Sequence, residues 1–139
     1  MTRQITGARV AADLPETMTA MGFDDPGGPD VLRPETLPVP EPGENQVLIR
    51  VSHAGINRPD VIQRQGFYPP PPGASPIPGL EVSGTVVAVG KGAAPELISR
   101  RVCALVSGGG YAEYCLAHSA HCLHVPETMS MATAAAIPE

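Results

Sequence analysis

The chain has 139 residues, of which 42% are hydrophobic and only 4% aromatic, and its formal net charge is -5. This length suits one domain with a modest core of aliphatic side chains. The acidic balance without a basic run argues against nucleic acid or an anionic membrane as a partner, and no apolar stretch approaches the roughly 20 residues that a membrane helix needs.

The first seventeen residues, Met1 to Thr17, show no clear hydrophobic period and lack the apolar centre of a secretory signal. We expect them to form a flexible extension in front of a main domain over residues 18–128. Three cysteines without such a signal indicate free thiols in a reducing compartment. We therefore expect a cytoplasmic protein.

Short strands separated by turns dominate the remaining sequence. A first strand is predicted over Thr19–Phe23, and "LPVPEPGEN" is predicted to be a proline-punctuated connector. The segment "QVLIRVSHAGI" alternates apolar and polar residues with the period of a strand. Further strands are predicted in "LEVSGTVVAVGKG", "RVCALV", "YAEYCLAH" and "HCLHV". So many short strands with hardly any helix between them indicate a small barrel or sandwich.

Two short helices are predicted. In "NRPDVIQRQG", Asn57 can cap the helix, Pro59 and Asp60 suit its first turn, and Gly66 can end it. The simplest role of Asn57 is this cap, but an amide at the end of a strand is also a common active-site group. A second helix is predicted from about Ser130, and the sequence stops while its alanines continue.

Histidines and cysteines gather in "EYCLAHSAHCLHVPE", which raises the question of a zinc site. If residues 111–118 form one strand, Cys115 and His118 face opposite sides of the sheet. The turn that follows can bring His118 near His121, which gives two ligands where zinc usually takes four. A hairpin with surface histidines and partly buried thiols is therefore favoured over a metal site.

Two other motifs each allow two interpretations. The segment "SGGGYAEY" resembles a phosphate-binding loop, but it leads into a strand rather than a helix, which favours a hairpin turn. The segment "YPPPPGASPIP" could be a polyproline ligand for another domain, although a stiff loop that positions its neighbours is favoured.

The run "AGINRPDVIQRQGFYPPPPGASPIPGLEVSGTVVAVGKG", followed by "RVCALVSGGGYAEYCLA" and "VPETMSMATAAAIPE", resembles the front of a medium-chain dehydrogenase/reductase. It is most similar to the zinc-independent quinone oxidoreductases related to zeta-crystallin, from about Thr19 to Glu139. The resemblance implies a mainly β protein, a GroES-like, partly open β-barrel with short helices. Residues 129–139 would begin the bridging helix to a Rossmann domain that binds NADPH in the family. That domain is absent from this chain, which has no G-x-G-x-x-G loop.

The resemblance also implies a site without metal. Zinc-dependent relatives have a cysteine where this chain has Asn57, and Gly-His-Glu where it has Gly79-Leu80-Glu81. Leucine cannot bind zinc, and an amide is a poor substitute for a thiolate. By the same resemblance, Asn57 lines the nicotinamide and the substrate, and Tyr68 is a candidate donor to a quinone oxygen, although it can equally be a packing residue.

Two positions depart from the family pattern. The zeta-crystallin branch has a tyrosine where this chain has Ile62, so the roles of that tyrosine do not transfer. The usual Gly-Asp-Arg-Val turn is replaced by Ser99-Arg100-Arg101-Val102, which removes favourable turn residues.

The resemblance therefore predicts the catalytic portion of an NADPH-dependent quinone oxidoreductase, an enzyme that transfers hydride to a quinone or related enone and forms a homodimer at full length. The 139 residues alone are expected to be inactive. The alternative is a non-catalytic, truncated GroES-like module that binds a partner.

Overall fold

The structure is a computed structural model that describes residues 7–10 and 13–139. Its main unit is a six-stranded antiparallel sheet with the strand order β7-β4-β5-β6-β8, with β1 added on β5. The strands of this sheet are β1 (Arg9–Val10), β4 (Gln46–Ala54), β5 (Glu81–Val89), β6 (Arg101–Leu105), β7 (Tyr114–His118) and β8 (Cys122–His124). In the described part of the chain β7 and β8 do not pair, so the barrel is not closed. The predicted mainly β, partly open fold is confirmed.

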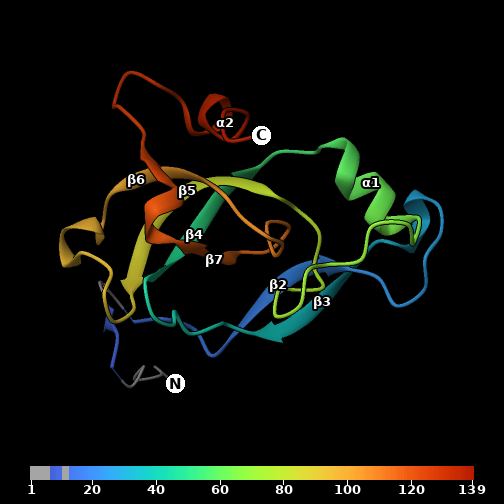
Figure 1. Ribbon diagram of the computed structural model, residues 1–139, viewed down its shortest axis with the longest axis horizontal. Helices are drawn as coiled ribbons and strands as arrows, with labels where there is room; N and C mark the ends of the chain where they lie inside the picture. Colours follow the sequence, from blue (N-terminus) through green and yellow to red (C-terminus); the bar gives the residue numbers. More distant parts are fainter. Residues whose placement is uncertain (1–6, 11–12) are drawn as a thin grey trace.

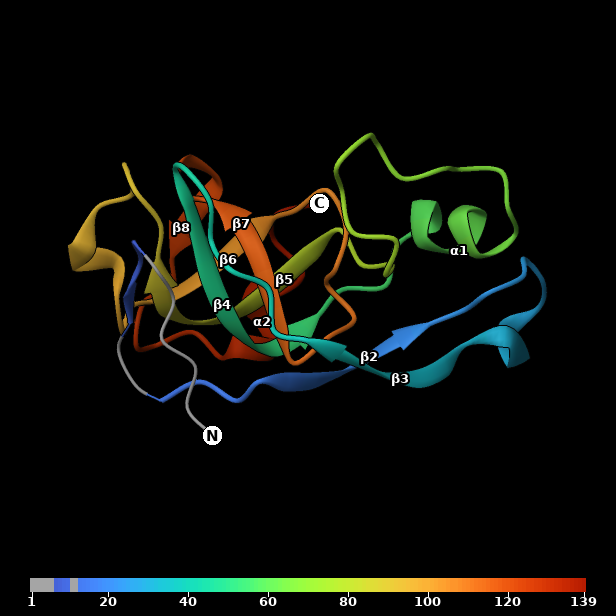
Figure 2. The ribbon, with the colours of Figure 1, turned by 90° about the horizontal axis from the view of Figure 1, so that it is seen from below.

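A second sheet pairs β2 (Thr17–Gly22) with β3 (Arg33–Pro38) and extends away from the main sheet (Figure 2). β2 begins two residues before the strand predicted over Thr19–Phe23. β3 was missed, since prolines occupy positions 34 and 38 and the connector was predicted to begin inside it. Proline is tolerated here because β3 pairs on one side only among the described residues, so its lost N–H donors are not needed.

The helices are short. α1 (Arg58–Arg64) lies at one end of the molecule, and α2 (Met131–Ala134) packs beside the main sheet (Figure 1). Three 3-10 turns complete the elements: η1 (Pro29–Val31), η2 (Pro95–Leu97) and η3 (Ser119–His121). The Ser130 hydroxyl caps α2 by accepting the Thr133 N–H over 3.1 Å, so the predicted helix start is confirmed.

Aliphatic residues of the central strands build the core. Val47 and Ile49 of β4 are fully buried, as the alternating pattern predicts, and so are Val82 and Val86 of β5. Leu48, which the pattern placed on the polar face of β4, is also fully buried. β5 is buried along both of its faces. One reason is that α2 covers the face that carries Ser83, whose hydroxyl donates to the Met131 carbonyl over 2.5 Å.

The boundary expected at Thr17 differs from the structure. Arg9 and Val10 pair with the end of β5, and Leu14 is buried against Met18 and other apolar residues. The reason is that Leu14 supplies apolar surface that the edge of the core can bury. Within the extension predicted over residues 1–17, residues 1–6 and 11–12 lie outside the described part.

Candidate active site

Asn57 lies at the junction of β4 and α1, in the N-cap position of the helix. Its backbone N–H donates to the Asp60 Oδ2 atom over 2.9 Å, which is one half of a capping box. The Asn57 side-chain nitrogen donates in another direction, to the Glu81 Oε1 atom over 2.8 Å. The two roles considered for Asn57 therefore coexist: its backbone belongs to the cap, and its amide contacts a carboxylate on the first residue of β5.

Glu81 is a buried carboxylate with 3% of its surface exposed. Its Oε1 atom accepts from Asn57, and its Oε2 atom accepts the Glu139 backbone N–H over 2.9 Å. Within the described residues no lysine, arginine or histidine forms a salt bridge with it. Hydrogen bonds alone therefore offset the cost of removing this carboxylate from water.

Asp60, the second buried carboxylate, is 4% exposed and joins three segments. Besides the Asn57 N–H, it accepts the Gly79 N–H over 3.0 Å and the Tyr111 hydroxyl over 2.9 Å. Burial, and then the hydrogen bond to Asp60, raise the pKa of Tyr111 far above its ordinary value. The Tyr111 hydroxyl therefore stays protonated and remains a donor.

Glu139 completes this group of residues, which we call the Asn57 network (Asn57, Asp60, Glu81, Tyr111 and Glu139). Partial loss of hydration raises the pKa of the Glu139 carboxyl, and the negative charges of Asp60 and Glu81 raise it further. A hydrogen bond with the Asn57 side chain acts in the opposite direction and favours the ionised form. Several carboxylates thus surround one amide.

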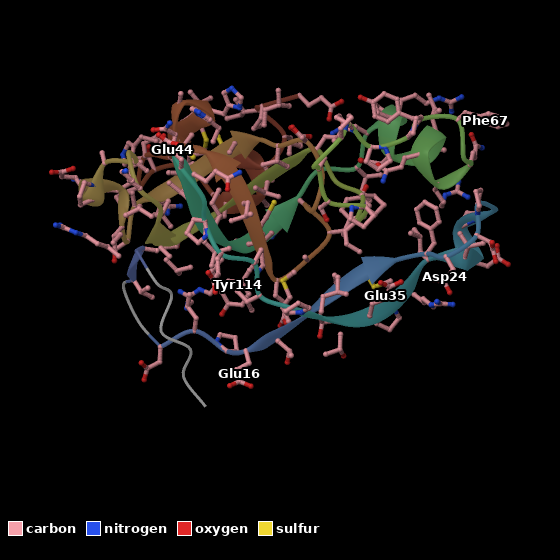
Figure 3. All side chains as sticks on the ribbon, turned by 60° about the horizontal axis from the view of Figure 1, so that its bottom comes forward. Glu16, Asp24, Glu35, Glu44, Phe67 and Tyr114 are labelled. Carbon is pink, nitrogen blue, oxygen red and sulfur yellow. The ribbon has the colours of Figure 1, made fainter. Side chains whose placement is uncertain are left out.

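Tyr68 does not belong to this network. It lies on the loop after α1, is 40% exposed, and its hydroxyl takes part in none of the hydrogen bonds between described residues. The adjacent Phe67 is 81% exposed and extends from the α1 end of the molecule (Figure 3). The proposed contact of Tyr68 with a substrate stays a prediction.

The histidine and cysteine segment is not the predicted hairpin, because β7 pairs with β4 and β8 pairs with β6. Its histidines and thiols are nevertheless placed as expected. Cys115 is buried in the core, while His118 is exposed on the other face of β7. The His118 and His121 rings lie 5.3 Å apart between centroids. Within residues 7–10 and 13–139, no three histidine, cysteine or acidic side chains are grouped in a way that could hold a metal ion. The absence of bound zinc itself stays a prediction.

The proline-rich loop returns to the core at its end, while Tyr68, Pro69 and residues 71–73 are exposed. Ile77 and Pro78 near its end are buried. Residues 71–77 form one wall of a groove of about 660 Å³, and residues 105–109 and 114–118 form much of the rest. No residue of the Asn57 network lines this groove.

Comparison with known proteins identifies the fold family. Residues 43–127 match the alcohol dehydrogenase GroES-like domain. The chain belongs to this family. The quinone oxidoreductase of Lama guanicoe is 37% identical over 122 residues, which cover 86% of this chain and 37% of that protein. Other curated relatives are also longer, since the chain covers 27% of one and 43% of another.

Solved structures of related proteins have the same fold as this chain. The human synaptic vesicle membrane protein VAT-1 homolog-like protein superposes with a TM-score of 0.80 at 34% identity, covering 88% of this chain and 40% of that one. A mycobacterial protein solved in complex with NADPH gives a TM-score of 0.74 at 37% identity, covering 85% and 35%. This GroES-like domain is therefore related to medium-chain oxidoreductases, including quinone oxidoreductases.

Among the described residues, no helix is both long enough and apolar enough to cross a membrane.

Of the residues in the Asn57 network, the sequence analysis proposed only Asn57 as a site residue. It placed Asp60 in the first turn of a helix and Glu81 in the Gly79-Leu80-Glu81 triplet. Tyr111 and Glu139 were missed. Two features of the sequence could have indicated the network. Glu81 is a charged residue that opens a long apolar strand, and Asp60 is an acidic residue in the first turn of a helix. A carboxylate that is buried at either place needs hydrogen-bond donors from other segments.

Proposed function

We propose that this GroES-like domain is the catalytic portion of a nicotinamide-dependent quinone oxidoreductase that reduces a quinone or related enone without zinc. The observation that carries the proposal is the bond between the Asn57 amide and the Glu81 carboxylate. By family resemblance, these residues stand where zinc-dependent relatives have a cysteine ligand and the glutamate of Gly-His-Glu. Leu80, at the histidine position, has no atom that could bind a metal.

The residues around Asn57 suit the nicotinamide end of NADPH. Asn57 is half-buried, and its amide reaches a carboxylate on a residue that is itself exposed. A polar oxygen of a ligand can therefore reach the same amide. The neighbouring Ile56 is 80% exposed and offers apolar surface beside this polar group, a combination typical of sites for ring-shaped ligands.

When bound, NADPH supplies the hydride, and the protein supplies orientation and hydrogen-bond donors. Asn57 would orient the reacting groups, and Tyr68 would donate to the quinone oxygen on which negative charge develops. The pyrophosphate would be held outside these 139 residues, since their sequence has no glycine-rich turn between a strand and a helix. The homodimer and the cytoplasmic location remain predictions.

The test uses the protein translated from its complete reading frame, mixed with NADPH and a simple quinone while the nicotinamide absorbance is followed. We expect steady NADPH oxidation that Asn57→Ala lowers at least tenfold. The 139-residue chain alone should show neither tight NADPH binding nor turnover, because donor and acceptor must be held together for effective catalysis. A complete protein that neither binds NADPH nor oxidises it would contradict the proposal and favour a non-catalytic binding module.

A further inference from the structure

We propose that Glu81 is the positioning residue of this site: its carboxylate fixes the Asn57 amide with the nitrogen toward Glu81, so that Asn57 meets a ligand as a hydrogen-bond donor. The first half of this inference stands on the structure alone. The second half rests on the proposed function, because it concerns the ligand.

The chemistry of the pair allows one orientation of the amide. An ionised carboxylate has only acceptor atoms, so the group that faces it must donate. The Asn57 nitrogen lies 2.8 Å from Glu81 Oε1, and rotating the amide by half a turn would place two acceptor oxygens against each other. Because Glu81 is buried, water cannot replace the lost donor at low cost.

The amide nitrogen of Asn57 carries a second hydrogen, which can meet another acceptor while the first is bound to Glu81. The Glu139 backbone N–H binds the remaining oxygen of Glu81, so Glu81 determines the place of both partners. A ligand oxygen that approaches this second hydrogen would therefore meet the N–H of Asn57 and not its carbonyl.

The backbone leaves the amide little other freedom. The Asn57 N–H is bound to Asp60, and the first residue of α1 follows directly, so the Cα position of Asn57 is fixed by the helix cap. The capping box also brings the Asn57 side chain to the Asp60 backbone N–H, which favours the same orientation of the amide. The bond to Glu81 holds the nitrogen end, and the positioning of this donor is the role that we assign to Glu81.

Gly55 provides the space that Glu81 needs. A Cβ atom on Gly55 would lie 2.0 Å from Glu81 Oε1, the atom that accepts from Asn57. Non-bonded carbon and oxygen atoms do not approach so closely, so Gly55→Ala would force the carboxylate away from Asn57. This substitution displaces Glu81 without changing either member of the pair.

The experiment measures hydrogen exchange of side-chain amide protons in the ¹⁵N-labelled 139-residue chain by NMR. The spectrum is simple because the sequence has two asparagines, Asn45 and Asn57, and four glutamines. Asn45 is the internal reference, since its side chain makes none of the hydrogen bonds found between described residues. A hydrogen bond to a charged group should slow exchange at Asn57 by about tenfold relative to Asn45.

Three variants test how the Glu81 carboxylate affects exchange at the Asn57 amide and at the Glu139 backbone N–H. Glu81→Leu and Gly55→Ala should both return the Asn57 exchange rate to that of Asn45. Glu81→Gln keeps one acceptor, so it should preserve slow exchange at Asn57 while speeding exchange of the Glu139 backbone N–H. Gly43→Ala is the matched control, because its added Cβ would meet only the Gln46 side chain, at 3.2 Å, and it should change neither rate.

Two results would overturn the inference. One is equal exchange of the Asn57 and Asn45 amides in the wild-type chain, a result that holds even if a variant fails to fold. The other is slow Asn57 exchange that persists in folded Glu81→Leu. Because neither measurement uses a cofactor or a substrate, their outcome is independent of whether the complete protein reduces quinones.

Discussion

Asp60 and Tyr111 are 51 residues apart in the sequence, yet the Tyr111 hydroxyl donates to the Asp60 carboxylate over 2.9 Å. The same carboxylate accepts N–H groups from Asn57 and Gly79. Asp60 therefore ties the start of α1, the turn before β5 and the glycine-rich segment before β7 to one another. The two positions that define the proposed active site, Asn57 and Glu81, border the segments that it joins.

Removing the Tyr111 hydroxyl should destabilise the fold. Tyr111→Phe leaves a buried carboxylate with one donor fewer, which should lower the free energy of unfolding by about 1–3 kcal/mol. Urea denaturation of both proteins measures the difference. Tyr114→Phe is the control, since Tyr114 is half-buried but its hydroxyl makes none of the hydrogen bonds found in the described residues; its effect should stay within about 0.5 kcal/mol. If Tyr111→Phe and Tyr114→Phe changed the free energy of unfolding equally, the bond from Tyr111 to Asp60 would not stabilise the fold.

A strained serine marks the turn where the family pattern is lost. Ser99 has φ = 66°, in the left-handed region that favours glycine, and it is exposed. Ser99→Gly should raise the free energy of unfolding by about 0.5–1 kcal/mol, because the strain of the side chain is relieved. Ser107→Gly tests whether any added glycine has this effect, since Ser107 does not have a positive φ. A loss of stability in Ser99→Gly would show that its hydroxyl matters more than its backbone strain.

Burial of a thiol predicts a pH dependence of stability. Burial raises the pKa of Cys115 from 9.0 to about 12, so above pH 9 the unfolded chain ionises this thiol while the folded chain does not. The contribution of Cys115 is thus fully present below pH 9 and is lost as the pH rises toward 12. At pH 10.5 the loss should be about 2 kcal/mol. Unfolding of Cys115→Ala at pH 8 and 10.5 should show a correspondingly smaller decline, and a parallel decline in both proteins would contradict this cause.

Replacing Tyr68 by phenylalanine distinguishes a role of its hydroxyl in catalysis from a role of its ring in packing. In the complete protein, Tyr68→Phe should lower kcat by roughly tenfold to a thousandfold if the hydroxyl meets developing charge. Its stability should hardly change, because the hydroxyl makes no hydrogen bond with another described residue. Turnover equal to that of the wild type would make Tyr68 a packing residue. Phe67→Leu, on the same loop, is the control for a non-specific effect of changing an aromatic side chain there.

Most of the fold follows from local sequence patterns. The strands β4, β5, β6, β7 and β8 and the start of α1 lie within the predicted segments, because apolar alternation and a cap depend on near neighbours. β3 was missed because its prolines are typical of loops, and only its pairing with β2 makes the segment a strand. The bonds of Asp60 to Gly79 and Tyr111, and those of Glu81, could not be predicted for the same reason, because their donors come from distant segments.

We propose that the Asn57 network serves hydride transfer without zinc. The most direct test is turnover of the complete protein with NADPH and a quinone, measured together with the zinc content after mild chelation. We expect far less than one zinc per chain, full activity in the presence of a chelator, and loss of activity in Asn57→Ala. About one zinc per chain, with activity that disappears on its removal and returns with added zinc, would contradict it.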